Sequence, residues 1–84
     1  MMFVDSILKP NKIFSDSDLQ ILVSESIKMN KSFIDFMKIN NIIANETVSV
    51  FNTLQKGYLK LNKDEIIALI NFDKVEEILK ANKN

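Results

Sequence analysis

The stretch Asn45–Leu61, NETVSVFNTLQKGYLKL, contains the only glycine of the 84-residue chain and decides the fold. Before Gly57 the apolar residues recur every three or four positions, which is typical of a helix with one buried face. They are Val48, Phe51 and Leu54, with Val50 beside them. Asn45 is expected to cap this helix through its side-chain oxygen, and Gly57 is expected to end it in the left-handed conformation.

The opposite face of this predicted helix is polar. It carries hydroxyl, amide and ammonium groups, namely Thr47, Ser49, Asn52, Thr53, Gln55 and Lys56. Glu46 is the only acid, and Lys60 and Lys63 follow after the glycine. Amide side chains can pair with adenine edges, while hydroxyls and lysines can hold phosphates. These side chains are therefore our candidate nucleic-acid-binding residues, and solvation alone is the competing interpretation of a polar helix face.

After Gly57 two interpretations compete. In the favoured one, Tyr58–Leu61 and Glu65–Ile70 are the two strands of a small β-hairpin, because tyrosine and β-branched isoleucine favour strands. In the other, Asn62 caps a further helix and Glu65 completes a capping box. The first predicts a mainly α fold with a small hairpin, and the second predicts an all-α bundle.

A helix over residues 16–29 is predicted earlier in the chain. Ser15 followed by Asp18 resembles a capping box at its start. The apolar residues at helical spacing within it are Leu19, Leu22, Val23 and Ile27.

Two more helices are predicted from the same kind of evidence. A short one ends near Ile39, and its apolar residues are Phe33, Phe36 and Met37. A last one starts at a capping box formed by Asp73 and Glu76 and runs to about Ala81. Its apolar stripe consists of Val75, Ile78 and Leu79.

The first fourteen residues show no helical period and contain Pro10, so we expect an N-terminal arm or short extended segment over residues 1–14. Residues 15–84 then form one domain. The arm's apolar residues, Phe3, Val4, Ile7 and Leu8, either complete the core or, like the last helix, provide the surface of a homodimer.

Several features of residues 33–70 occur together in one order. They are FIDFMKINN at 33–41, ETVS at 46–49, Leu54, the pair Lys56–Gly57 and the pair Tyr58–Leu59. In this order they resemble a bacterial or phage winged helix-turn-helix of the MarR or Crp kind. The resemblance implies a third helix in the major groove of DNA and a wing on the DNA backbone or in the minor groove. Val50 departs from the arginine that is usual after ETVS, and the expected wing has no glycine.

A second resemblance is to phage-repressor helix-turn-helix domains. LQKG at 54–57 corresponds to the glycine turn of these domains, and Asp64–Leu69 corresponds to the helix that follows this turn. This resemblance implies an all-α domain with the same class of function, in which Lys60 and Lys63 lie on a loop.

Composition argues against an enzyme. The chain has no cysteine and no histidine, so the commonest nucleophile and general base are missing, and no ordinary zinc site can form. We expect no cofactor. The start of the chain lacks a basic leader before a long apolar block, and the longest apolar run is Ile66–Ile70. We therefore expect a cytoplasmic protein that does not span a membrane.

Charge points to residues 40–63 as the region that contacts a partner. The whole chain is neutral and has no arginine, but this region has three lysines against one acid, whereas residues 64–84 have five acids against three lysines. The sequence thus predicts a small DNA-binding protein, such as a transcriptional regulator or a phage or plasmid replication accessory protein, that binds double-stranded DNA as a homodimer. The alternative is a winged-helix-shaped protein-interaction module, such as a phage-type inhibitor, adaptor or anti-repressor. It predicts an exposed apolar patch around Phe33, Phe36 or Phe72.

Overall fold

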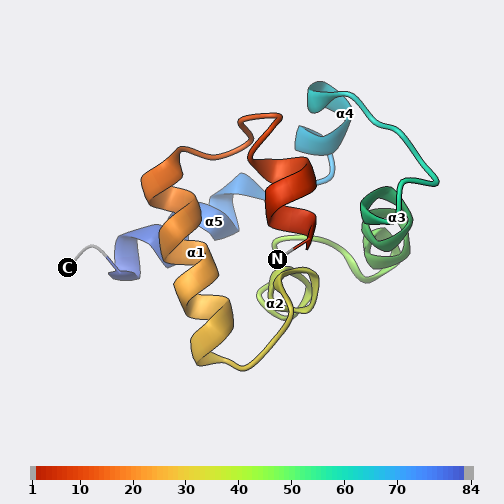
Figure 1. The fold of residues 1–84 in the computed structure, drawn as a ribbon. Coiled ribbons are helices and arrows are strands. Elements are labelled where there is room, and N and C mark those ends of the chain that lie inside the picture. The colour runs from red at the N-terminus through yellow and green to blue at the C-terminus, as the bar shows by residue number, and fades with distance from the viewer. Residues whose placement is uncertain (1, 83–84) are drawn as a thin grey trace.

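A computed structural model describes residues 2–82 of the chain, and the regular secondary structure of this part consists of helices joined by turns and loops (Figure 1). The elements are a π-helical turn η1 (Val4–Leu8) and the helices α1 (Asp16–Lys28), α2 (Phe33–Ile39), α3 (Asn45–Gln55), α4 (Lys63–Ile67) and α5 (Phe72–Asn82). α1 packs against α2 and α5, and α2 packs against α3. None of these helices has the length and apolar character that crossing a bilayer requires.

The favoured β-hairpin was wrong, because residues 2–82 contain no strand. The all-α alternative fits instead, since Asn62 and Glu65 form the capping box that it required. The Asn62 N–H donates to Glu65 Oε1 and the Glu65 N–H donates to Asn62 Oδ1, both over 2.9 Å. Ile66 within α4 and Ile70, three residues after its end, are both buried in the core. Local capping and burial therefore override the preference of isoleucine for strands.

The expected N-terminal extended segment was also wrong. Residues Val4–Leu8 form the turn η1, and Phe3, Val4 and Leu8 are buried in the same core as the later helices. The rings of Phe3 and Phe51 lie 5.1 Å apart between centroids. The spacing of the apolar residues does suit a helical turn, and the prediction gave Pro10 too much weight, since this proline lies beyond the turn.

The start of α1 was predicted correctly, and so was its buried stripe except for Ile27, since Leu19 and Leu22 are buried and Val23 packs against the core. Ser15 caps the helix by accepting a hydrogen bond from the Asp18 N–H over 3.2 Å. Ile27, expected in the core, is 65% exposed, and Ser26 is buried in its place. The Ser26 hydroxyl donates to the Val23 carbonyl over 2.7 Å, so this buried polar side chain is satisfied within its own helix.

Two helices start earlier than predicted, α3 by one residue and α5 by two. Ala44 has the extended backbone of the N-cap of α3, and its side chain makes no capping hydrogen bond, so Asn45 is the first helical residue instead of the cap. α5 begins at Phe72, which places Asp73 in its first turn.

The surfaces suggested for a homodimer are mostly used within the monomer. Phe3, Val4 and Leu8 near the N-terminus, and Val75 and Leu79 on α5, are all buried in the core of one chain. Of these two groups only Ile7 and Ile78 remain partly exposed.

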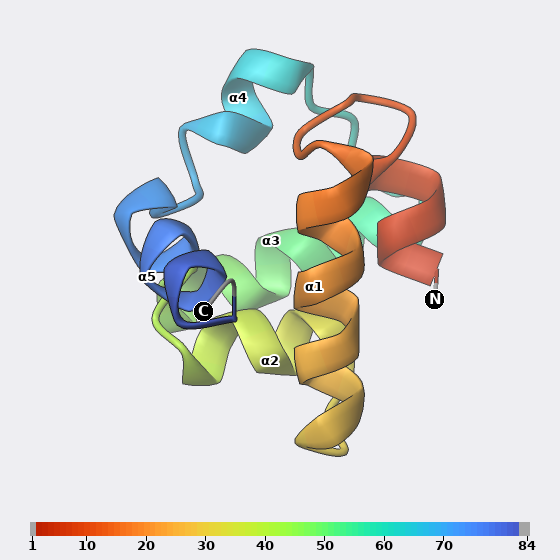
Figure 2. The same ribbon diagram turned by 90° about the vertical axis from the view of Figure 1, so that its left-hand side faces the viewer.

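The α2–α3 pair forms an antiparallel hairpin. Both helices are seen end-on in Figure 1 and side-on in Figure 2, and they run beside each other in opposite directions. The start of α2, at Ser32–Asp35, consequently lies beside the second half of α3, at Asn52 and Gln55.

We predict that Phe51→Ala lowers the free energy of unfolding by about 3–5 kcal/mol, because the ring is fully buried against Phe3 and its removal leaves a cavity. Chemical denaturation followed by circular dichroism measures the change. Ile27→Ala is the matched control on an exposed apolar residue and should cost less than about 1 kcal/mol. Equal losses in the two variants would contradict the burial of Phe51 described above.

Candidate nucleic-acid interface

The exposed side of α3 carries one row of polar residues. Asn45, Ser49, Thr53 and Lys56 are all exposed. Their spacing places them on the same side of the helix, because residues three and four apart are neighbours on a helical surface. We call these four residues the outer ridge of α3. Three of them were predicted as site residues, whereas Asn45 was missed because it had been assigned to the cap.

Thr47 is not on the exposed side of α3, so its prediction as part of the polar face was wrong. Its side chain is only 8% exposed and lies on the core side of α3 with Phe51 and Leu54. Threonine is small enough to be buried at the start of a helix, and polarity alone did not distinguish it from its exposed neighbours.

Asn52 and Gln55 are half-buried instead of fully exposed. They line a hollow of about 320 Å³ together with Met2, Ser32 and Asp35, at the place where the start of α2 meets α3. A ligand would therefore contact these two side chains from the hollow, at the side of the outer ridge.

The hydroxyl groups of the outer ridge already donate to the backbone of α3. The Thr53 hydroxyl donates to the Ser49 carbonyl over 2.8 Å, and the Ser49 hydroxyl donates to the Glu46 carbonyl over 3.4 Å. Their oxygens can still accept a hydrogen bond, but their donors are occupied. This arrangement suits contact with a donor or with water better than donation to a phosphate.

Gly57 controls how the chain leaves α3. It has a φ of 83°, and its N–H donates to the Leu54 carbonyl over 3.1 Å, while the Tyr58 N–H donates to the Thr53 carbonyl over 3.2 Å. These two bonds define the Schellman ending of a helix, as the sequence predicted for this glycine. The chain then reaches Asn62, whose capping box starts α4.

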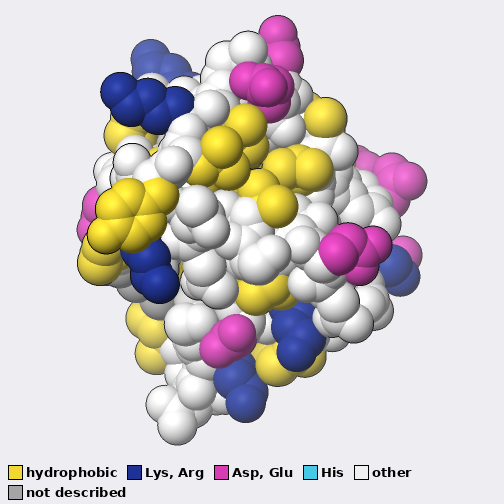
Figure 3. All heavy atoms as spheres, turned by 90° about the vertical axis from the view of Figure 1, so that its right-hand side faces the viewer, with side chains coloured by type: hydrophobic (Ala, Val, Ile, Leu, Met, Phe, Trp, Pro, Cys, Tyr) yellow, Lys and Arg dark blue, Asp and Glu magenta, His cyan; other side chains and the backbone are white. Residues whose placement is uncertain are grey.

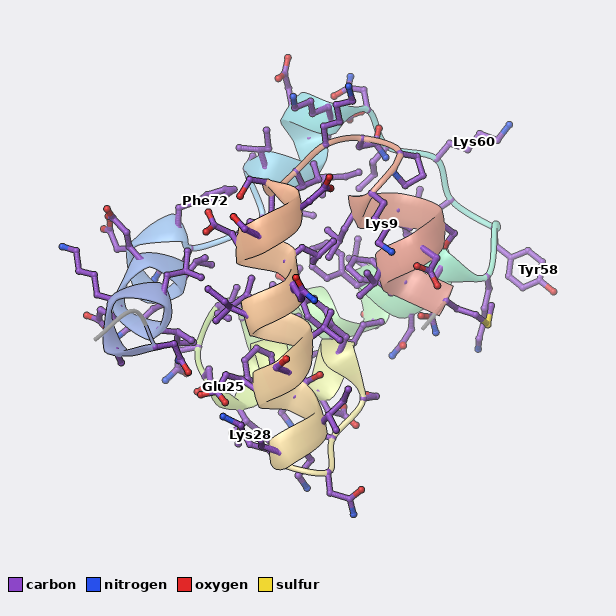
Figure 4. All side chains as sticks on the ribbon, turned by 60° about the vertical axis from the view of Figure 1, so that its left-hand side comes forward. Lys9, Glu25, Lys28, Tyr58, Lys60 and Phe72 are labelled. Atoms are coloured by element: carbon purple, nitrogen blue, oxygen red, sulfur yellow. The ribbon has the colours of Figure 1, made fainter. Side chains whose placement is uncertain are left out.

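The connection between α3 and α4 alternates between exposed and half-buried residues. Tyr58 and Lys60 are exposed, while Leu59 and Leu61 are half-buried. Figure 4 shows the side chains of Tyr58 and Lys60 projecting away from the helices on the same side of the molecule. Lys63, the first residue of α4, is also exposed.

We call Lys56, Lys60 and Lys63 the lysine segment. The ion pairs found between residues 2 and 82 are Lys9–Asp5 at 3.2 Å, Lys28–Glu25 at 3.4 Å and Lys74–Glu77 at 3.5 Å. No member of the lysine segment takes part in any of them. Its ammonium groups are therefore available to an anionic partner.

The surface around the lysine segment is mixed in character. On the face that carries α3 and α4, lysine, acidic and hydrophobic side chains are interspersed, and no continuous positive patch covers it (Figure 3). Asp64 and Glu65 follow Lys63 directly in the chain. The lysines of the lysine segment are therefore not part of a larger positive patch on this face.

The apolar patch expected for a protein-interaction module is not formed by the residues named for it. Phe33 and Phe36 are buried, and Phe72, the third, is 37% exposed and packs against Phe14 with 5.7 Å between ring centroids. The most exposed large apolar side chains are instead Tyr58 and Met2. Sequence reasoning missed Tyr58 as a surface feature because it assigned the residue to a strand.

Comparison with known proteins adds no family to this description: no protein-family model matches the chain, and neither do any curated proteins or solved structures.

We predict that Gly57→Ala lowers the free energy of unfolding by about 1–2 kcal/mol, because an L-residue with a side chain is strained at a left-handed position. A Cβ added there would meet no atom within 4 Å, so the cost comes from the backbone alone. Thermal and chemical unfolding measure it. Lys12→Gly is the control, because it places a glycine at another left-handed position, where Lys12 has a φ of 52°. Glycine adopts this conformation without strain, so the change should not destabilise the protein.

Proposed function

We propose that this domain binds DNA through the lysine segment and the adjoining outer ridge of α3. The observation that carries the proposal is a row of exposed polar side chains that runs into three exposed lysines without acidic partners in the described ion pairs. Lysine ammonium groups near a nucleic acid release condensed counterions, which favours binding at low salt. The domain acts by binding, without catalysis, in a compartment that contains DNA, which for a bacterial or phage protein is the cytoplasm.

The proposed contact is mainly with phosphates. Lysine attracts phosphate as a point charge and lacks the two-pronged geometry with which arginine reads guanine. The occupied hydroxyl donors of Ser49 and Thr53 also argue against a base-reading helix deep in the major groove. Contacts of this kind position a protein on DNA and carry little sequence information.

The affinity of one domain should be weak. The chain is neutral overall, and three lysines can neutralise at most about three phosphates. A homodimer would double this number, and we include such pairing in the proposal as the route to useful affinity. The buried apolar residues of η1 and α5 would not form its surface, because they already complete the monomer core.

A protein-interaction module remains the second candidate. The observation that favours it is the exposure of two large apolar side chains, Tyr58 at 83% and Met2 at 66%, on a neutral protein. Tyrosine is enriched among the residues that dominate binding energy at protein interfaces. This candidate predicts no dependence of binding on the lysine segment and none on salt beyond ordinary screening.

The test is a fluorescence-anisotropy titration of a labelled AT-rich duplex at about 50 and 200 mM salt. We predict that replacing Lys56, Lys60 and Lys63 together by Gln weakens binding and lowers the slope of log affinity against log salt by about 2–3, because each neutralised phosphate contributes about 0.9. The fold should be unchanged, because all three side chains are exposed.

The matched control replaces Lys28, Lys74 and Lys80 by Gln, which removes the same charge from α1 and α5. This variant should keep most of the salt slope of the unchanged protein. Equal losses in the two triple variants would refute the proposed interface and leave only a general charge effect. Absence of binding at roughly 100 µM protein, the weak end of non-specific DNA binding, would refute DNA as the partner and favour the second candidate.

A further inference from the structure

Tyr58 is the most exposed large apolar side chain described, with 83% of its surface accessible. It lies two residues after Lys56 and two residues before Lys60, so an aromatic ring stands between two cationic side chains. An exposed ring of this kind contributes no burial to the fold, and its removal should leave the core intact.

The backbone on both sides of Tyr58 is held in place. Its own N–H donates to the Thr53 carbonyl in the Schellman ending of α3, and Asn62 is fixed by the capping box of α4. Leu61 packs against the core from between these two points. The ring and Lys60 therefore project from a short, anchored connection, on the side seen in Figure 4.

Tyr58 also lies next to the outer ridge of α3. In a Schellman ending, the residue after the left-handed position is brought close to the third residue from the helix end. For α3 these two residues are Tyr58 and Thr53, and Thr53 is an exposed member of the outer ridge. The same construction at α2 brings Ile42 to Met37, and both are buried there. At both endings the hydrogen bond places the following residue beside the third-last residue of the helix.

We propose that Tyr58 is a stacking platform for an unpaired base, and that Lys56 and Lys60 hold the phosphates on either side of the stacked nucleotide. The ligand class is single-stranded nucleic acid. A base in a duplex is covered on both faces by its neighbours, whereas an unpaired base offers a free face to an aromatic ring. The inference rests on the proposed function, because it uses the same lysine segment, and it adds a preference for single strands over duplex.

The chain contains one tyrosine and no tryptophan, so its fluorescence reports on Tyr58 alone. The experiment titrates the full chain with an unlabelled single strand and follows quenching of tyrosine emission. In parallel, anisotropy compares a labelled single strand with a duplex of the same sequence. We expect quenching by the single strand, little quenching by the duplex, and tighter binding of the single strand.

We predict that Tyr58→Ala weakens single-strand binding by about 5- to 150-fold, which corresponds to the measured range for one base stacked on an aromatic side chain. Binding of the duplex should change little. Tyr58→Phe keeps the ring and should retain most of the single-strand affinity. Thermal unfolding of each variant checks that the fold is intact.

The outcomes separate the two proposals. In one outcome both nucleic acids bind through the lysine segment, but Tyr58→Ala does not weaken binding and tyrosine emission does not change. This outcome would refute stacking and leave the proposed function standing. Absence of binding to either nucleic acid would refute both proposals. Loss of single-strand binding in Tyr58→Phe as large as in Tyr58→Ala would also refute stacking, because the phenylalanine ring stacks as well.

Discussion

The fold depends on four chain reversals of one type, each built around a single left-handed residue. In each case the next residue donates its N–H to the carbonyl five residues earlier. The left-handed residues are Lys12, Asn30, Asn41 and Gly57. The corresponding N–H to carbonyl hydrogen bonds run from Ile13 to Leu8 at 3.2 Å, from Lys31 to Ser26 at 3.0 Å, from Ile42 to Met37 at 2.8 Å and from Tyr58 to Thr53 at 3.2 Å. Helices of 5 to 13 residues are marginal in isolation, so these reversals and the shared core jointly determine how they pack.

The sequence was sufficient wherever the signal was local. The cap at Ser15, the ending at Gly57 and the exposure of Ser49, Thr53 and Lys56 follow from interactions within a few residues, and the structure agrees with them. It was insufficient wherever burial by distant elements decided the outcome. Nothing local distinguishes Thr47, which is buried, from Thr53, which is exposed, and nothing local shows that Ser26 replaces Ile27 in the core.

The β-hairpin prediction failed in a way that explains why strand preference is a weak guide here. The β-branched side chains of Ile66 and Ile70 favour a strand, but a two-stranded hairpin without further strands beside it has little stability in water. The capping box at Asn62 offers the backbone a local alternative, and both isoleucines are buried without a strand, Ile66 within α4 and Ile70 three residues after its end. Tyr58 was consequently predicted as a strand residue, although the structure makes it the most exposed large apolar side chain of the part it describes.

The reversal at Gly57 links the fold to the candidate site. Two of the other three reversals bring an apolar residue back onto a buried one, Ile13 onto Leu8 and Ile42 onto Met37, so they seal the core. At Gly57 the third-last residue is Thr53, which belongs to the exposed side of α3, and Tyr58 is exposed beside it. At Asn30 the third-last residue, Ser26, is buried, yet Lys31 is exposed, so the side chain that follows the turn matters as well. The ending at Gly57 therefore fixes the position of Tyr58 beside the outer ridge, while the lack of an apolar neighbour on that side of α3 leaves its ring exposed.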